Sequence, residues 1–484
     1  MPLILPGNVG SATAAVGFNV ANSCRFNDGS SDNLSKTNAS GNSDMTKFTV
    51  SFWFKKTIPT ISNGGGLFLI KNASNNTADK VMIYFLDDKI NCFISDGSGG
   101  TESNVVPNRL FRDTSAWTHI TYRYDSTQGT DSNRVRLYIN GVQETSLATA
   151  NYPDQNHAQP IDNSTETIIG KSVYSNGNAY YYDGYMNEVL LVDNQSLAPT
   201  NFGEFDEDSG IWKPIKVSGL TFGDGGFLLD FQASANLGND ANGGTDFTEN
   251  NLTAIDQSTD TCTNNFATLN PLDGNLGDSL FTEGNLKFDT NTGSNKPWSR
   301  STIGVSSGKW YFEAKLITAA NNQAIGISDR PSPDHNSTEL GAGAFDYSYQ
   351  SANSGDKYNN GSQSSYGNTY GANDIVSCAL DLDNLKVYFG KNGTFQNSGD
   401  PTSGATGTGA AFTITAPSLT NHGFYFFCLA DLTGANKSVW EANFGSPSFA
   451  ISSGNTDGNG YGNFEYAVPS GYFALNTKNL AEYG

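Results

Sequence analysis

The strongest constraint on this chain is a pattern that occurs twice: a run of alternating apolar and polar residues that leads into Asn-Gly. Residues 135–139 read VRLYI before Asn140-Gly141, and residues 385–389 read LKVYF shortly before Asn392-Gly393. A side-chain period of two is that of a half-buried β-strand. Asn-Gly accommodates the positive φ that both central residues of a type I′ turn require. The pattern therefore predicts a β-hairpin in each half of the chain.

Other segments continue the same alternation or form short buried apolar runs. They are 48–54, 81–85 and 120–124 in the first half, and 308–316, 374–383, 422–431 and 437–444 in the second. No amphipathic helix longer than two turns is evident. Short strands separated by turn residues are typical of β-sandwiches. We predict an all-β protein with two sandwiches in tandem.

The alternation stops between the two halves, which suggests where the domains divide. We expect an N-terminal attachment segment at 1–20, a sandwich at 21–205, a Gly/Asn-rich joining segment at 206–275, a second sandwich at 276–450 and a C-terminal tail at 451–484. The joining segment contains one strand-like run, FLLDF at 227–231, which could pack on either domain.

The charge of the chain excludes several classes of partner. The net charge is −21 and no Lys/Arg cluster is present, so we expect no nucleic-acid binding. The first 20 residues lack a basic region, and no run approaches the ~18 apolar residues of a membrane span, so we expect neither a signal peptide nor membrane insertion. The five cysteines lack CxxC spacing; Cys92, Cys378 and Cys428 lie in apolar runs and are predicted to be buried free thiols.

Several motifs resemble known families. Residues 23–193 contain FTVSFWFK, WTHITYRYD, RVRLYINGV and DGYMNEVLLVD in an order that resembles LamG-like concanavalin sandwiches. Residues 282–449 contain GKWYFEAKL, AIGISD, a segment ending LDNLKVYFGKNG, and WEANFG, and resemble SPRY domains. The resemblance implies two concanavalin-like jelly rolls, LamG-like and then SPRY-like.

The joining segment and the C-terminus resemble virion proteins of tailed phages, especially those of marine bacteria. The matching stretches are GEFDEDSGIWKPIKV, LDFQASANLGNDANGG, DQSTDTCTNNFATLNPLD and PSGYFALNTKNLAEYG. This resemblance implies a non-catalytic protein of the virion, such as a tail fibre, a tail spike or a head-attached fibre. Other virion proteins and a host surface glycan are the partners it implies, and such fibres are often homotrimers.

Two groups of tyrosines are candidates for carbohydrate binding. In the first, Tyr174, Tyr180, Tyr181 and Tyr182 lie with Asp183 in a Gly/Asn-rich loop, and in the second Tyr347 and Tyr349 begin another such stretch. Sugars stack their apolar C–H faces on aromatic rings while polar side chains bind the hydroxyls. The alternative is that these rings cover the ends of the sandwiches or contact another subunit.

We expect no cofactor, with calcium as an alternative at one position. Asn455, Asp457 and Asn459 have the spacing of the first ligands of a calcium loop, but Tyr466 stands where a bidentate Glu is required. A plain turn is the competing interpretation.

Catalysis is not expected, and the alternative is a polysaccharide depolymerase or glycosidase. Glu204, Asp206 and Asp208 keep the spacing of a glycosidase carboxylate motif but lie outside the strand pattern, where an acidic turn is predicted. The four histidines are far apart in sequence, and no serine has the surroundings of a nucleophile elbow. The sequence therefore predicts a binding protein without catalytic activity.

Overall fold

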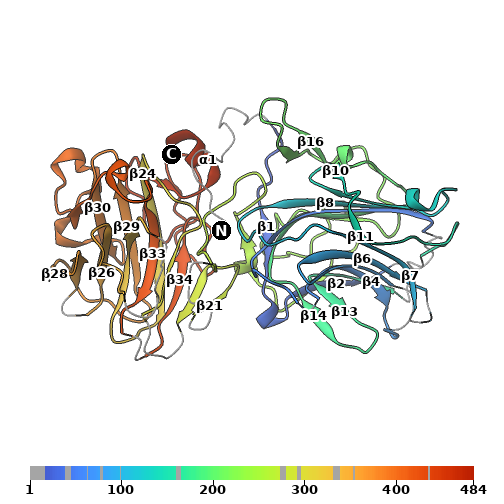
Figure 1. Ribbon diagram of the computed structural model, residues 1–484, viewed down its shortest axis with the longest axis horizontal. Helices are drawn as coiled ribbons and strands as arrows, with labels where there is room; N and C mark the ends of the chain where they lie inside the picture. Colours follow the sequence, from blue (N-terminus) through green and yellow to red (C-terminus); the bar gives the residue numbers. More distant parts are fainter. Residues whose placement is uncertain are drawn as a thin grey trace. The chain divides into compact units, whose positions relative to one another are not determined.

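The computed structural model describes residues 17–484 except 39–44, 63, 77–79, 97, 99, 160–164, 273–278, 291–295, 331–337, 353–354 and 434–435. The chain divides into two compact units, with the boundary between Thr263 and Asn264. Each unit is a β-sandwich of its own, so the predicted all-β fold with two tandem sandwiches is confirmed. Figure 1 shows the strands of the first in blue to green and those of the second in yellow to red.

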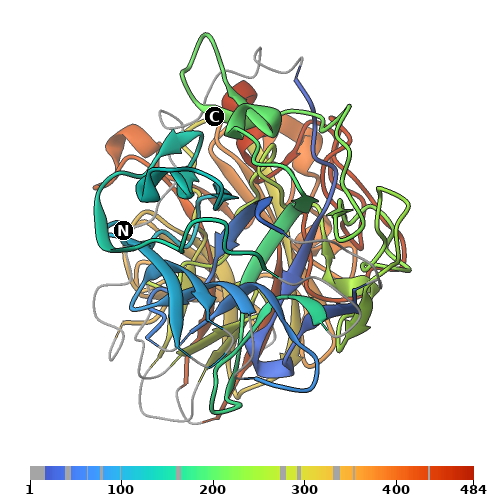
Figure 2. The same cartoon turned by 90° about the vertical axis from the view of Figure 1, so that its right-hand side faces the viewer.

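The first sandwich consists of two eight-stranded sheets, and its strands face the viewer in Figure 2. Sheet 1 has the order β10 (Val142–Gln143), β9 (Val135–Ile139), β8 (Thr118–Asp125), β3 (Lys47–Lys56), β15 (Gly184–Asp193), β1 (Ser23–Phe26) and β20 (Gln257–Ser258), with β18 (Phe227–Leu229) also paired to β15. Sheet 2 has the order β11 (Leu147–Asn151), β7 (Thr101–Pro107), β6 (Lys89–Ser95), β5 (Lys80–Leu86), β4 (Gly66–Asn72), β12 (Thr165–Ile169), β2 (Asn33–Thr37) and β19 (Thr248–Asn250). Two separate hairpins accompany them: β13 (Lys171–Val173) with β14 (Ala179–Tyr181), and β16 (Gly203–Phe205) with β17 (Trp212–Pro214).

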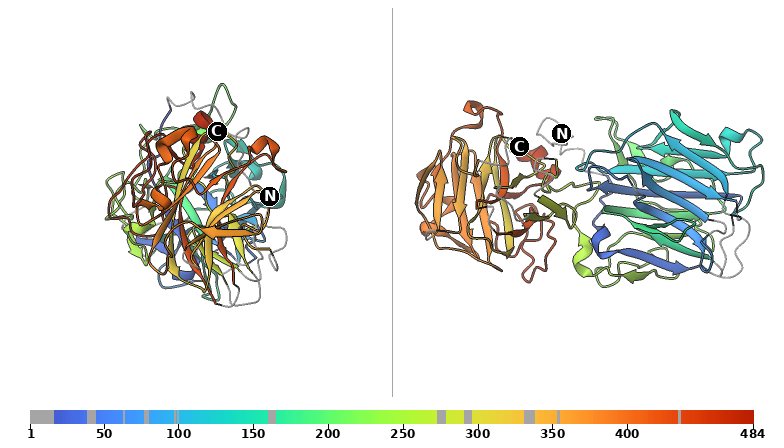
Figure 3. Two further views of the ribbon diagram at one scale, coloured as in Figure 1. Left: turned by 90° about the vertical axis from the view of Figure 1, so that its left-hand side faces the viewer. Right: turned by 60° about the horizontal axis from the view of Figure 1, so that its bottom comes forward.

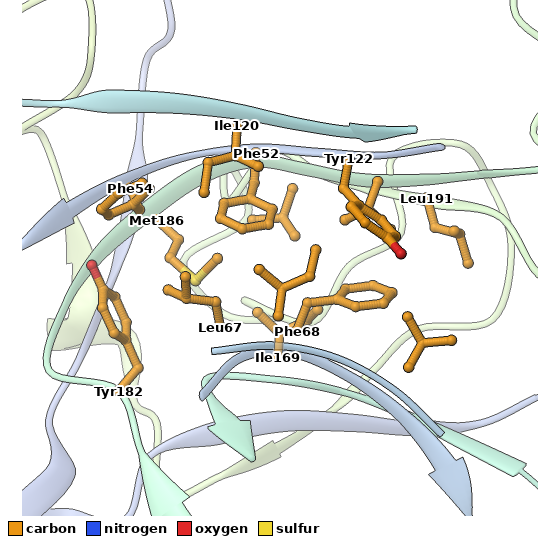
Figure 4. Close-up of a cluster of buried hydrophobic side chains, with 14 of the residues drawn as sticks. Phe52, Phe54, Leu67, Phe68, Ile120, Tyr122, Ile169, Tyr182, Met186 and Leu191 are labelled. Atoms are coloured by element: carbon orange, nitrogen blue, oxygen red, sulfur yellow. The ribbon is translucent and has the colours of Figure 1, made fainter. Parts of the chain in front are cut away.

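The core of the first sandwich comes from the inward faces of its alternating strands. Phe52 and Phe54 on β3 point toward Phe68 on β4, and Figure 4 shows these side chains filling the space between the sheets. Leu67 also points inward, because the register of β4 shifts between Gly66 and Phe68. Consecutive side chains on a strand point to opposite faces, so this alternation yields one buried face per sheet. Asn140 and Gly141 have φ of 48° and 76°, as the predicted I′ turn between β9 and β10 requires.

Much of the segment expected to join the domains is built into the first sandwich. Four short strands of this segment pair with earlier strands: β17 with β16, β18 with β15, β19 with β2, and β20 with β1. Two buried ion pairs add to this attachment, Arg25–Asp256 at 3.1 Å and Lys55–Asp260 at 2.6 Å. The first unit therefore extends to Thr263, well beyond residue 205.

The second sandwich has a nine-stranded and a six-stranded sheet, and its strands are yellow to red in Figure 3. The larger sheet has the order β21 (Ser279–Thr282), β22 (Lys287–Thr290), β34 (Val439–Asn443), β24 (Lys309–Thr318), β29 (Ile375–Asp381), β30 (Lys386–Lys391) and β31 (Thr394–Phe395), with β32 (Phe412–Thr413) on β30 and β35 (Phe473–Ala474) on β24. The smaller has the order β23 (Trp298–Arg300), β33 (Phe426–Asp431), β25 (Gln323–Ser328), β26 (Asp346–Gln350), β27 (Asp356–Asn359) and β28 (Ser362–Ser365).

The expected C-terminal tail also belongs to its sandwich. Strand β35 pairs parallel to β24, and Leu475 and Leu480 are buried in the second core. Leu480 lies on α1 (Thr477–Tyr483), the one α-helix among the described residues. In the part of the chain that is described, no helix is long and apolar enough to cross a membrane.

Short 3₁₀ turns complete both units. They lie at Asp28–Ser30, Asp131–Asn133, Pro199–Asn201, Ala254–Asp256, Gln396–Ser398, Pro401–Thr406 and Pro417–Leu419. The five cysteines are free thiols, and Cys92, Cys378 and Cys428 are buried as predicted.

Candidate functional site

The tyrosine-rich segment of the first sandwich forms the β13–β14 hairpin, which lies against β4 of sheet 2 (Figure 1). The approach is close because Gly66 of β4 has no side chain: a Cβ there would lie 1.9 Å from the backbone nitrogen of Ser172. At the tip, the backbone N–H of Tyr174 donates to the Asn178 carbonyl at 2.9 Å, and Gly177 has a φ of 85°. The hairpin therefore covers part of the outer face of sheet 2.

The tyrosines of this hairpin point in different directions. Tyr174 packs on Tyr84 of β5, with ring centroids 5.6 Å apart, and on Tyr180 at 5.0 Å. This small cluster is half-buried and continues an apolar patch on the outer face of sheet 2. Tyr181, the next residue, points away from the cluster, because neighbouring side chains on a strand alternate. Its half-buried ring lines a groove together with Lys171.

Tyr182 and Asp183 are not available to a ligand, which corrects their assignment as binding residues. Tyr182 is fully buried and belongs to the cluster drawn in Figure 4, and its hydroxyl donates to the Lys55 carbonyl at 2.9 Å. Asp183 is buried and accepts a hydrogen bond from the Thr57 hydroxyl. The chain enters the core directly after β14, and a run of three tyrosines does not reveal where that happens.

Tyr347 and Tyr349 are also core residues rather than binding residues. Both lie on β26 and are at most 4% exposed. The Tyr347 hydroxyl accepts from the Thr415 backbone N–H at 3.1 Å, and the Tyr349 hydroxyl donates to the Asn368 carbonyl. The Gly/Asn-rich composition around them predicts loops, but these two rings occupy strand positions that face inward.

The groove beside Tyr181 is the candidate site. It encloses about 470 Å³ on the outer side of β2, β12 and β19. Its lining residues come from five strands and two turns: Ser31, Asn33, Ser35, Glu166, Ile168, Lys171, Tyr181, Glu249, Asn250 and Asn251. Of these, only Tyr181 belongs to the residues predicted from sequence. On β2, polar residues alternate with the core residue Leu34, and this alternation could have indicated from sequence that β2 forms one wall of the groove. Strand β19 gives no such signal, because its three residues lie in a segment whose composition predicts a loop.

Hydrogen bonds hold the polar side chains of the groove in defined orientations. The Asn250 amide donates to Asn33 Oδ1 at 3.2 Å and to the Thr248 carbonyl at 3.3 Å. The Asn251 amide donates to the Ser30 carbonyl at 2.8 Å. Because carbonyl oxygens accept only, the amide nitrogens face the protein, and the side-chain oxygens of Asn250 and Asn251 remain as acceptors.

The two carboxylates of the groove also have protein partners. Glu166 forms an ion pair with Lys71 at 2.7 Å, and Glu249 accepts from the backbone N–H of Leu237. Lys171 places its ammonium 5.5 Å from the centre of the Tyr181 ring. The groove therefore combines an aromatic ring with acceptor-rich polar walls, which is the composition of a binding surface for a hydroxylated ligand.

The segment considered as an alternative calcium loop is a structural turn that anchors the C-terminal segment. Asp457 is buried, and its carboxylate accepts from the backbone N–H groups of Asn459 and Tyr461, both at 2.9 Å. It also accepts from the backbone N–H of Ala474 at 2.9 Å and the amide of Asn479 at 2.7 Å. Each of the two carboxylate oxygens of Asp457 thus accepts two hydrogen bonds from the protein.

The side chains flanking Asp457 point to the protein as well. The Asn455 amide donates to Ser453 Oγ at 2.9 Å, and that of Asn459 donates to Asn479 Oδ1 at 2.9 Å. Among the described residues, no group of three or more His, Cys, Asp or Glu side chains could hold a metal ion.

The acidic run at 204–208 lies within the first unit as part of the β16–β17 hairpin, and the predicted acidic turn covers only its residues after β16. Glu204 lies on β16, while Asp208 lies in the turn that leads to β17. Asp206 accepts from the backbone N–H and the hydroxyl of Ser209, and these bonds together with Lys213 lower its pKa to about 2. A carboxyl that binds its proton this weakly is not suited to act as a glycosidase acid.

One serine and one histidine are in hydrogen-bond contact, but in the wrong tautomer for catalysis. Ser51 Oγ lies 2.8 Å from His119 Nε2, and Trp212 Nε1 donates to His119 Nδ1 at 3.0 Å. An indole N–H donates only, so Nδ1 is the acceptor and Nε2 carries the proton that it donates to the serine. Burial lowers the pKa of His119 to about 3, which keeps the ring neutral. A ring in this state cannot take a proton from Ser51.

Each of the two domains matches a known family model. The laminin G-type model of the concanavalin A-like lectin/glucanases superfamily matches residues 28–199, and the SPRY domain model matches residues 309–426. The superfamily description includes both lectins and glucanases, so it leaves binding and catalysis open.

Individual relatives are distant. The chain is 36% identical over 107 residues to the ATP-dependent RNA helicase Ddx1 of Drosophila melanogaster, a match that covers 22% of this chain and 14% of the helicase. The SPRY domain of human HERC1 is 20% identical, with 36% of this chain and 96% of that domain covered and a TM-score of 0.28. A pentraxin from Limulus polyphemus is 14% identical, with 44% and 94% covered and a TM-score of 0.29. With the family matches and the strand pairing together, the chain contains a LamG/concanavalin-like domain followed by a SPRY domain.

Proposed function

We propose that this chain is a non-catalytic structural and host-recognition protein of a bacteriophage particle, and that its LamG-like domain recognises the host surface. The observation that carries the recognition role is the groove at β2, β12 and β19, where Tyr181 stands beside fixed polar side chains. Sites on rigid sheets are held more accurately than sites on loops. The tail fibre, tail spike and head-attached fibre are the places in the particle that fit this role.

The virion setting rests on the resemblance of four stretches to tailed-phage proteins. Three of them lie around β16–β17, β18 and β20, and the fourth contains β35 and α1. The first, second and fourth stretches therefore each belong to one of the two units, and the third runs from β20 across the boundary at Thr263. Other virion proteins would be its partners in assembly, and a homotrimer would present several grooves at once, which raises the overall affinity of weak individual sites.

Purified particles test the virion assignment. Peptide mass spectrometry should find this chain in particles that remain intact through a density gradient, and antibodies against the chain should label one defined part of the particle in electron micrographs. If the chain appears only in the lysate and never in gradient-purified particles, the virion assignment is wrong.

A depolymerase is the second candidate, because Glu166 and Glu249 both line the groove. Glycosidases use a carboxyl pair in which one member holds a proton for the leaving oxygen. Glu166 is instead committed to Lys71, which favours the binding role. Incubation of the chain with host polysaccharide should release no new reducing ends. Release that is lost in both Glu166→Gln and Glu249→Gln would establish the enzyme instead.

A further inference from the structure

The groove beside Tyr181 has a chemistry that selects among classes of ligand. We propose that it binds an uncharged saccharide, stacked on the Tyr181 ring, and that it discriminates against anionic sugars. This inference deepens the recognition role proposed above and rests on it.

The Tyr181 ring is held in place before any ligand arrives. Tyr181 lies opposite Lys171 in the register of the β13–β14 hairpin, and the Lys171 ammonium lies 5.5 Å from the ring centre. The tight packing of Ser172 on Gly66 fixes the base of the same hairpin. A fixed ring loses little conformational freedom on binding, so the contact with the C–H face of a sugar costs little entropy.

The polar groups that face the groove are mostly hydrogen-bond acceptors. The amide nitrogens of Asn250 and Asn251 are used by the protein, which leaves their side-chain oxygens for a ligand. Glu166 and Glu249 add carboxylate oxygens beyond those that Lys71 and Leu237 engage. A wall of acceptors is complementary to hydroxyl donors, which a saccharide supplies in large number.

The charge of the lining disfavours anionic ligands. The carboxylates of Glu166 and Glu249 are matched by the ammonium groups of Lys171 and of Lys71, which pairs with Glu166, so the groove has no excess of positive charge, and the whole chain carries a net charge of −21. A uronate or a sulfated sugar would bring a further negative charge next to these carboxylates, and like charges that lose solvent repel strongly. The groove therefore fits a neutral saccharide.

The direct test is binding of the purified full-length chain to a printed array of neutral, anionic and amino glycans, in buffer containing EDTA. Neutral glycans should bind, and calorimetry with the best of them should give a stoichiometry of one per chain. Tyr181→Ala should weaken this binding by about tenfold or more, because the stacked ring is the main apolar contact. Tyr181→Phe keeps the ring and should bind within about twofold of wild type.

Tyr180→Ala is the matched control, because Tyr180 lies on the same hairpin but packs on Tyr174 instead of lining the groove. It should bind like wild type, and the melting temperature of each variant shows that the fold is intact. The inference is wrong if no neutral glycan binds, if anionic or amino glycans bind more tightly, or if Tyr181→Ala binds like wild type.

The outcome is separable from that of the proposed function. A chain that binds no neutral glycan but is present in purified particles overturns the ligand class and leaves the virion role standing. A chain that binds neutral glycans through Tyr181 but is absent from particles overturns the virion role and leaves the ligand class standing.

Discussion

Replacement of Asp260 by Ala tests whether the segment after residue 205 is part of the first sandwich. The Asp260 carboxylate lies 2.6 Å from the Lys55 ammonium of β3, and both side chains are 1% exposed. It also accepts a hydrogen bond from Trp117 Nε1 at 3.0 Å. Removal of the carboxylate leaves the lysine charge in the interior without this partner.

The expected cost follows from these contacts. Breaking a buried ion pair by removing one partner costs about 3–5 kcal/mol, and the lost indole hydrogen bond adds about 1 kcal/mol. We therefore expect Asp260→Ala to lower the free energy of unfolding of the first sandwich by about 5 kcal/mol. With a urea dependence of about 2.5 kcal/mol per molar, the unfolding midpoint falls by about 2 M.

The assay must report each sandwich separately, and the buried cysteines allow this. Cys92 lies in the first core and Cys378 in the second, and both are 0% exposed. Thiol labelling at increasing urea, read by peptide mass spectrometry, gives one unfolding curve per sandwich. The Cys92 curve should shift and the Cys378 curve should not.

Glu207→Ala is the control, because Glu207 is an exposed residue of the same segment. Its midpoint should change by less than about 0.3 M, as for surface substitutions in general. A shift this small for Asp260→Ala would refute the reasoning that this segment completes the first core.

Three further predictions concern single side chains. Tyr182→Ala should destabilise the first sandwich by about 3–5 kcal/mol, whereas Tyr181→Ala should cost less than about 1 kcal/mol, as measured by urea unfolding. Burial, followed by the nearby Asp230, raises the pKa of Glu188 to about 7. The folded state thus holds this proton more tightly than the unfolded chain, so stability is lost as the pH rises from about 4.5 to 7. Glu188→Gln should match wild type at pH 4 and be more stable at pH 8, and equal stability at pH 8 would contradict this. Asp457→Ala should lower the unfolding midpoint of the second sandwich, while calcium or EDTA should leave the wild-type melting temperature unchanged.

The alternation of apolar and polar residues predicted the long strands because it is a local property. The run 135–139 forms β9 with these same limits. The alternating run 308–316 begins one residue before β24 (Lys309–Thr318). Strands of two or three residues such as β19 carry no such period. Strand β19 exists because β2 offers an edge with which it can pair, which is a property of the folded sheet and not of the segment.

The candidate site was harder to predict because burial of a tyrosine depends on distant partners. Tyr181 and Tyr182 are neighbours of the same type, yet one lines the groove and the other fills the core. The difference arises where the hairpin ends and the chain turns inward. Glu249 and Asn250 are more than 60 residues from Tyr181 in the sequence and reach the groove because β19 pairs with β2. Nothing in their local sequence indicates this pairing.

The central claim is that the chain recognises a host surface through the groove beside Tyr181, and competition for adsorption tests it most directly. Host cells are incubated with purified chain, and the adsorption rate of particles is then measured. Wild-type chain and Tyr180→Ala should slow adsorption in a concentration-dependent manner, and Tyr181→Ala at the same concentration should not. Unchanged adsorption at saturating wild-type chain, or equal competition by Tyr181→Ala, would contradict the claim.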